Sequence, residues 1–157
     1  MLYFIETILP LAVSKNFTYQ VSQAEFEYIQ VGMRVAVPFG KSKIYTALVL
    51  DKHNNPPQLY QAKEIHQILD EKPVVNSIQI QHWKWIANYY MCSLGEVYRS
   101  ALPTGFIIES ETLISLTPNV ELDLYQLKDD EYLVVEALKI QSSLKISNYL
   151  PKKNIKD

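Results

Sequence analysis

The hydrophobic pattern of the chain changes near residue 70, from a period of two to a helical period. Before that point, short stretches rich in β-branched and aromatic residues alternate with Pro, Gly and Asn, which is typical of strands joined by tight turns. The predicted strands are residues 2–9, 17–21, 34–37, 44–50 and 62–69. Pro38 is expected to end the third strand, because proline cannot donate a hydrogen bond to a neighbour. This pattern indicates a small β-barrel-like or sandwich domain.

Two helices are predicted to follow the strands. Large apolar side chains recur there at intervals that place them along one face of a helix. They are Ile80, Trp83, Ala87, Tyr90 and Leu94. Asn76 or Ser77 can cap the first helix, and Ser93 with Glu96 has the spacing of a capping box for a second one.

We expect these helices to pack on the strands through Trp83, Trp85 and the neighbouring tyrosines. A tryptophan pair in such a helix more often packs in a core than serves as a stacking platform for bases. The fold class that follows is α+β, a β-barrel-like or sandwich domain with two packed helices.

The charge of the chain is unevenly distributed. Residues 1–104 carry nine Lys and Arg against eight Asp and Glu, whereas residues 105–157 carry six against nine. The second segment predicts a helix over 129–140, with an acidic first turn that suits the positive end of the helix dipole, and a further helical turn over 144–150. Leu133, Ala137 and Ile140 are expected to point inward. The change in composition places a domain boundary between residues 104 and 105.

Composition excludes several classes of protein. The single cysteine, Cys92, cannot form an internal disulfide, and the three histidines share no ligand spacing, so we predict no metal site. No phosphate-binding glycine motif is present, which argues against a catalytic or nucleotide-triphosphate site in this chain. The net charge of −2 argues against binding nucleic acid by bulk positive charge, although a small local site remains compatible with it.

The N-terminal segment predicts neither secretion nor membrane insertion. It is apolar but lacks a basic leading region, and Glu6 and Pro10 interrupt it. We therefore expect a cytoplasmic protein that has no membrane partner.

Three separate segments carry residues suited to hold a nucleotide. Phe17, Thr18 and Tyr19 place two aromatic rings around a hydroxyl, Gly40 lies in a turn where a ligand can approach the backbone, and Lys63 supplies a cation. Aromatic faces, backbone groups and a lysine together can hold a base and a phosphate. Taken singly, the aromatic residues are more often core and the lysine more often solvated surface.

Five motifs then follow one another in order across residues 1–103. They are LPL followed by FTY at 17–19, GMRVAVPFG at 32–40, the 65–73 segment ending in DEKP, WIANYY at 85–90, and LGEVYRSALP at 94–103. Together they resemble the N-terminal region of the PriA family of replication-restart helicases, also called primosomal protein N′.

This resemblance implies a domain organisation and a role. Residues 1–104 would form a 3′-DNA-binding domain that captures the 3′ end of the nascent leading strand at a stalled or branched fork. Residues 105–157 would begin a winged-helix domain that is incomplete here, mostly helical, and would leave the chain an N-terminal fragment. The full-length parent would be an ATP-dependent 3′→5′ DNA helicase that holds zinc, while this fragment would be no enzyme and need no cofactor.

The resemblance also implies partners and site residues. The partners would be branched or forked DNA with a 3′-OH end and, through the parent, other primosome proteins and single-strand-binding proteins. The family's 3′-end site maps onto Phe17, Thr18, Tyr19, Gly40 and Lys63. Thr18 occupies a position that is commonly acidic in the family. A neutral hydroxyl bonds the DNA 3′-hydroxyl about half as strongly as a carboxylate does, so selectivity would be weaker or would rest on backbone groups.

A second hypothesis comes from a different class. The slightly acidic charge also fits a protein-interaction module that does not itself contact DNA. Salt dependence separates the two, because phosphate contacts weaken steadily with salt whereas an apolar docking surface does not.

Overall fold

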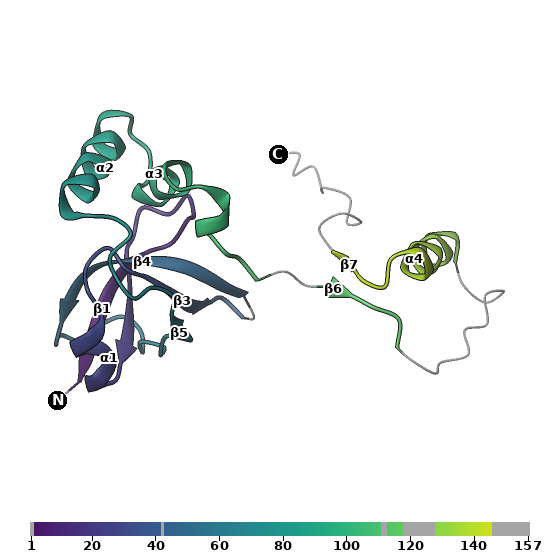
Figure 1. Ribbon diagram of the computed structural model, residues 1–157, viewed down its shortest axis with the longest axis horizontal. Coiled ribbons are helices and arrows are strands. Elements are labelled where there is room, and N and C mark those ends of the chain that lie inside the picture. The colour runs from purple at the N-terminus through teal and green to yellow at the C-terminus, as the bar shows by residue number, and fades with distance from the viewer. Residues whose placement is uncertain (1, 42, 111–112, 118–127, 146–157) are drawn as a thin grey trace. The chain divides into compact units, whose positions relative to one another are not determined.

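The computed structural model describes residues 2–41, 43–110, 113–117 and 128–145. The chain divides into two compact units, residues 1–110 and residues 111–157, which are described separately below (Figure 1).

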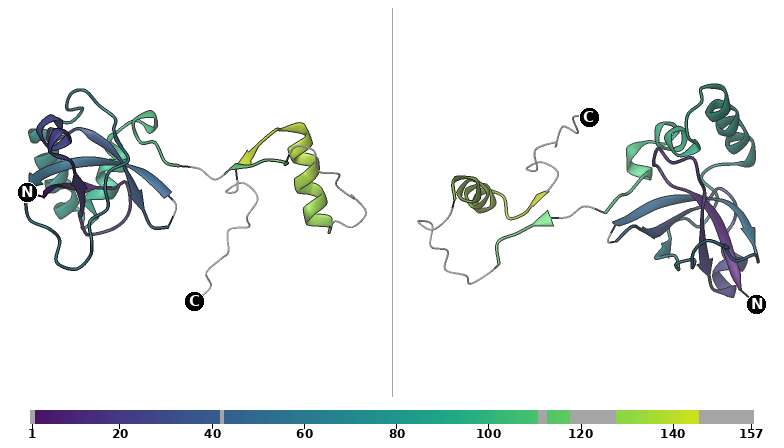
Figure 2. Two further views of the ribbon diagram at one scale, coloured as in Figure 1. Left: turned by 90° about the horizontal axis from the view of Figure 1, so that it is seen from below. Right: turned by 180° about the vertical axis from the view of Figure 1, so that it is seen from behind.

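Unit 1 is built on a five-stranded antiparallel sheet that curls into a half barrel (Figures 1 and 2). In their order across the sheet, the strands are β2 (Phe17–Val21), β1 (Tyr3–Ile8), β4 (Lys43–His53), β3 (Arg34–Phe39) and β5 (Gln67–Ile68). The pairing of β1 with β4 shifts register between Glu6 and Thr7, and such a bulge increases the local twist. The predicted α+β class is confirmed, with a half barrel as its sheet.

β3 continues through Pro38, so the prediction that this proline ends the strand is wrong. The carbonyls of Arg34 and Ala36 point away from β4, since they accept hydrogen bonds from Leu69 and His66. Residues two apart in a strand face the same way, so the nitrogen of Pro38 also points away from β4. The missing N–H therefore costs the β3–β4 ladder no hydrogen bond.

The strand expected at 62–69 is reduced to two residues because this segment bonds to two different strands. The backbone N of Gln20 in β2 donates to the Lys63 carbonyl at 2.9 Å, and only Gln67 and Ile68 pair with β3. A segment that crosses between two strands can follow each one for only a few residues. The crossing links β2 at one end of the strand order to β3 near the other.

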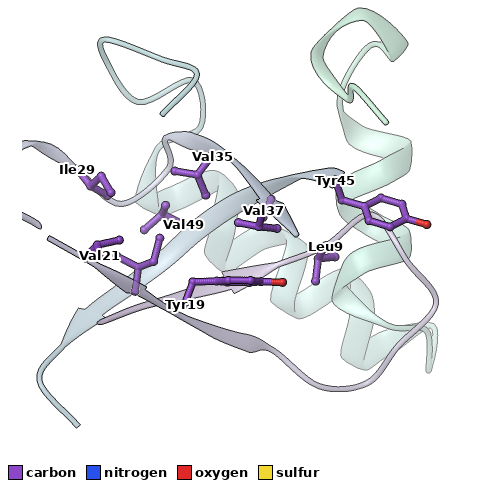
Figure 3. Packing of buried hydrophobic residues seen from close by; sticks show 10 residues of the cluster. Leu9, Tyr19, Val21, Ile29, Val35, Val37, Tyr45 and Val49 are labelled. Carbon is purple, nitrogen blue, oxygen red and sulfur yellow. The ribbon is translucent and has the colours of Figure 1, made fainter. Parts of the chain in front are cut away.

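A hydrophobic core fills the inside of the half barrel. Val35, Val37 and Val49 of β3 and β4 face Tyr19 and Val21 of β2 (Figure 3). Alternate residues of each strand point to this face, as the period of two predicts.

Two helices, α2 (Ser77–Tyr89) and α3 (Leu94–Ala101), pack on the other face of the sheet. They bury a second cluster made of Ile8, Leu48, Val75, Ile80, Trp83, Val97 and Tyr98. Asn76 is the N-cap of α2, and the predicted Ser93–Glu96 capping box of α3 is confirmed. Leu94 begins α3 instead of extending the first helix, because the chain reverses near Met91, whose φ is +54°.

Trp85 does not pack on the strands as expected. Trp83 is 7% exposed and belongs to the second cluster, whereas Trp85 is 56% exposed. Positions two apart on a helix point about 200° apart, so the two tryptophans cannot both face the sheet. Trp85 stacks between His82 and Tyr89, with ring centroids 5.8 and 5.2 Å away, and Tyr89 contacts Tyr90. These four side chains are called the exposed aromatic ladder.

A short helix, α1 (Gln23–Tyr28), was not predicted. Its signal is present in the sequence, since Ser22 and Glu25 also form a capping box. Its single packed ring, Phe26, lies 4.9 Å from that of Tyr3, and a helix of this length shows no apolar periodicity.

Residues 105–110 belong to unit 1 by their hydrogen bonds. After the 3₁₀ helix η1 (Thr104–Phe106), the chain runs along a part of β4 that β1 does not cover. The backbone N of Thr46 donates to the Ile108 carbonyl at 3.1 Å, and that of Ser110 donates to the Ile44 carbonyl at 3.0 Å.

Unit 2 contains a helix, α4 (Asp129–Ile140), and a two-stranded antiparallel pair of β6 (Leu113–Ile114) with β7 (Leu144–Lys145). The predicted helix is confirmed. The helical turn expected at 144–150 begins instead with a strand, and its remainder lies outside the described residues.

The inward face predicted for α4 is wrong. Val135 and Leu138 are the buried apolar residues, whereas Leu133 and Ile140 are exposed and Ala137 is half-buried. Apolar residues lie on more than one side of this helix, so periodicity alone does not select the packed one. In the part of the chain that the structure describes, no helix has the length and hydrophobicity needed to cross a membrane.

Candidate nucleic-acid interface

The five residues singled out from the sequence line one cavity of about 230 Å³ in unit 1. They come from β2, from the β3–β4 turn and from the segment that crosses from β4 toward β5. The other lining residues are Pro38, Phe39, Tyr60 and Gln61.

β2 supplies one wall of the cavity. Phe17 and Tyr19 pair with Thr7 and Ile5 of β1. The backbone N–H of the intervening Thr18 points away from β1, because it donates to the Tyr60 hydroxyl at 2.9 Å. β2 thus offers aromatic rings together with a polar outer edge.

Aromatic rings and a tyrosine hydroxyl shape the floor. The Phe39 ring lies edge-on to those of Phe17 and Tyr45, at centroid distances of 5.0 and 5.9 Å. The Tyr19 hydroxyl donates to the Pro38 carbonyl at 3.2 Å. Burial, and next the neighbouring Tyr60, raise the pKa of Tyr19, so this phenol stays protonated and keeps its donor role.

Gly40 and Lys63 meet across the cavity mouth. Gly40 has a φ of +68°, which glycine adopts without strain, and no other group approaches the position where a Cβ would lie. The Lys63 ammonium donates to the Gly40 carbonyl at 3.0 Å. Both residues are exposed, so a ligand can reach the turn backbone and the ammonium together.

The described residues that line the cavity give it a positive charge. Among the described residues that line it, Lys63 is cationic and none is acidic. A larger cavity of about 370 Å³ lies along α2 and α3, but its lining is mostly apolar and carries Glu96 as its charged group. The smaller cavity therefore suits an anionic ligand with an aromatic part.

Sequence reasoning missed Tyr60. Its hydroxyl meets Thr18 across 42 positions of sequence, a contact that no local periodicity reveals. The sequence offered one indication of it, an aromatic residue shortly after the Asn54–Pro57 loop.

Comparison with known proteins places these observations in a family. A family model described as "3'DNA-binding domain (3'BD)" of PriA matches residues 6–103, which include all five site residues. Three curated relatives are named replication restart protein PriA. The relative from Treponema pallidum is 26% identical over 105 residues, covering 64% of this chain and 16% of its own length. That from Haemophilus influenzae is 42% identical over 78 residues, covering 48% and 10%.

The third relative, from Buchnera aphidicola, is 30% identical over 111 residues, covering 70% of this chain and 15% of its own length. The chain thus spans only a small part of each curated relative. The family model, in contrast, covers more than half of the chain, from within β1 to just beyond α3. This chain belongs to the PriA 3′DNA-binding domain (3′BD) family.

Proposed function

We propose that this chain is the DNA-binding region of a replication-restart protein and that it recognises the 3′ end of the nascent leading strand at stalled or branched forks. The observation that carries the proposal is the convergence of Phe17–Tyr19, Gly40 and Lys63 on one cavity. These residues come from three segments far apart in sequence. The cavity has the scale of a single nucleoside, which suits a chain terminus better than a length of duplex.

Each group has a role that follows from its chemistry. The rings of Phe17 and Phe39 offer apolar faces to the terminal base. Lys63 can exchange its neutral bond with the Gly40 carbonyl for a stronger charge-assisted bond to a backbone phosphate. Thr18 offers a hydroxyl to the terminal 3′-hydroxyl of the DNA.

The charge of residues 1–104 supports recognition by a few placed groups. This segment is close to neutral, so bulk attraction to duplex DNA contributes little. Loss of the single Lys63 contact should reduce the salt dependence by about one phosphate equivalent.

The test uses forks that differ only at the nascent strand. Binding to a fork with a 3′-OH at the junction should exceed binding to the same fork with a 3′-phosphate or with no nascent strand. A terminal phosphate would place a charge against the apolar rings of Phe17 and Phe39, and the cost of desolvating that charge should weaken binding. In this proposal Lys63 already binds a backbone phosphate and cannot fully offset that cost. Equal affinity for all three forks would overturn the proposal.

We propose that this domain belongs to a longer parent protein. The domain would position an ATP-dependent 3′→5′ helicase motor for primosome assembly, and the parent would meet primosome and single-strand-binding proteins in the cytoplasm. Within the segment 105–157, the part that lies in unit 2 would begin a winged-helix domain, and α4 and the β6–β7 pair are compatible with that proposal.

We assign no catalytic, ATP or zinc site to this chain. In the described ranges, no three His, Cys, Asp or Glu side chains gather closely enough to hold a metal ion. The parent's ATP and zinc sites would belong to other parts of the longer protein.

A second candidate function, a protein-interaction module, is favoured by the exposed aromatic ladder. Trp85 and Tyr89 of α2 and its C-cap residue Tyr90 are 56, 65 and 68% exposed. Such rings are enriched at the centres of protein interfaces. Binding through this surface should survive added salt, whereas binding of a DNA end through Lys63 should weaken.

A further inference from the structure

Tyr60 completes the cavity from a loop that joins β4 to β5. Its hydroxyl oxygen accepts the backbone N–H of Thr18 at 2.9 Å, and its side chain is 48% exposed. The loop is held on both sides of the cavity just beyond this residue. The Lys63 carbonyl accepts from the backbone N of Gln20, and the Lys63 ammonium donates to the Gly40 carbonyl. The loop that carries Tyr60 is therefore anchored at Lys63, and the Thr18 N–H contacts the Tyr60 hydroxyl directly.

The hydrogen-bond capacity of this hydroxyl is only partly used. A phenol donates one hydrogen bond and accepts up to two. Thr18 N–H occupies one acceptor site, and no described residue accepts the Tyr60 proton. The Thr18 hydroxyl likewise makes no hydrogen bond to the described residues. Tyr60 and Thr18 both line the cavity, and each carries a hydroxyl that can donate and accept.

A terminal 3′-hydroxyl has the matching capacity, since it too donates one bond and accepts two. We propose that Tyr60 is a specificity-determining residue of the 3′-end site, and that its hydroxyl acts with that of Thr18 to recognise the 3′-hydroxyl of the bound strand. The proposal rests on the function proposed above. Both hydroxyls are neutral, so recognition comes from hydrogen-bond matching.

A purely structural role for Tyr60 makes a different prediction. If its hydroxyl only fastened the loop to β2, its removal would weaken binding of every DNA end to the same extent. If it contacts the 3′-hydroxyl, its removal weakens only ends that carry one. The ratio of affinities for 3′-OH and 3′-deoxy ends separates these roles.

The experiment measures the affinity of the full chain for three forks by fluorescence anisotropy. The forks carry a nascent strand ending in 3′-OH, the same strand ending in 3′-deoxy, or no nascent strand. The unmodified chain should prefer the 3′-OH end to the 3′-deoxy end. Tyr60→Phe keeps the ring, and it should weaken 3′-OH binding about three- to tenfold, as expected for one neutral hydrogen bond, while 3′-deoxy binding stays the same.

Tyr28→Phe is the matched control, because Tyr28 is 49% exposed and does not line the cavity. It should leave all three affinities unchanged. Thr18→Val removes the other hydroxyl at nearly constant volume and should also lower the ratio of 3′-OH to 3′-deoxy affinity. It gives a second measurement if Tyr60→Phe disturbs the loop.

Two results would overturn the role of Tyr60 alone. In the first, Tyr60→Phe has the same ratio of 3′-OH to 3′-deoxy affinity as the unmodified chain. In the second, the unmodified chain binds 3′-OH and 3′-deoxy ends equally but binds both more tightly than the fork without a nascent strand. Equal binding of all three forks by the unmodified chain would overturn the proposed function as well.

Discussion

Asp70 holds Arg34 through both its backbone and its side chain. One carboxylate oxygen of Asp70 accepts the Arg34 backbone N–H at 2.8 Å and the guanidinium Nε at 3.0 Å. The guanidinium also donates to the Phe106 carbonyl at 2.7 Å and lies 4.6 Å from the centre of that ring. Arg34 thus connects β3 to the segment after β5 and to η1. Its contacts stabilise the fold, and it does not line the candidate DNA-binding cavity.

Arg34→Ala should therefore lower the free energy of unfolding by about 3 kcal/mol, because it leaves the Asp70 carboxylate largely buried without its partner. Urea unfolding followed by circular dichroism measures the change. Arg34→Ala combined with Asp70→Ala should cost less than the sum of the single changes. Full additivity would show that the pair is not coupled.

Lys63→Ala should weaken binding to a fork with a 3′-OH end by about 1–2 kcal/mol, the size of one lost charge-assisted contact. The control is Lys84→Ala, which removes an exposed lysine of α2 that lies outside this cavity. Anisotropy titrations at two salt concentrations measure both variants. An unchanged affinity in folded Lys63→Ala would remove this residue from the site.

Thr18→Asp should increase the preference for a 3′-OH end over a 3′-phosphate end. A carboxylate bonds a hydroxyl about twice as strongly as a neutral acceptor does and repels a phosphate. Thr18→Asn is the uncharged control. Competition between the two ends for one labelled fork measures the preference, and a preference that is the same in both variants would contradict the assigned position of residue 18.

The two tryptophans should respond differently to truncation. Trp83→Ala should lower the unfolding free energy by about 3–5 kcal/mol, because Trp83 is buried between α2 and the sheet. Trp85→Ala should change it by less than about 0.5 kcal/mol, since the ring lies on the exposed aromatic ladder. Thermal or urea unfolding of the two variants side by side tests the assignment.

Helix α3 should contribute a pH-dependent part to stability through Glu96. Hydrogen bonds from the side chain and then the backbone of Ser93 lower the pKa of Glu96 below its ordinary value. Its charged form is thus favoured by folding, so this contribution is present at neutral pH and is lost as the pH falls through the lowered pKa. Glu96→Gln keeps a capping side chain without the charge and should flatten the acid limb of the stability curve. An acid limb identical to that of the unmodified chain would contradict this.

Local residue chemistry was sufficient to predict much of unit 1. Strand alternation and the Ser93–Glu96 capping box depend on neighbours within a few positions, and they predicted the β1–β4 strands and α3. The local rule failed at Pro38, where the cost of proline depends on which way its nitrogen points. It failed again at Trp85, where only the packing of α2 selects the buried side of the helix.

By itself, the sequence predicted the α+β class and showed the family resemblance, because both depend on the order and spacing of residue types along the chain. The resemblance also singled out five candidate site residues, Phe17, Thr18, Tyr19, Gly40 and Lys63. Only the tertiary structure brought these residues to one cavity and added Tyr60 to them. The physical reason is that the Thr18–Tyr60 hydrogen bond depends on the curl of the sheet and on the path of the loop from β4 to β5. Both are set by packing between segments far apart in sequence, and no local pattern records them.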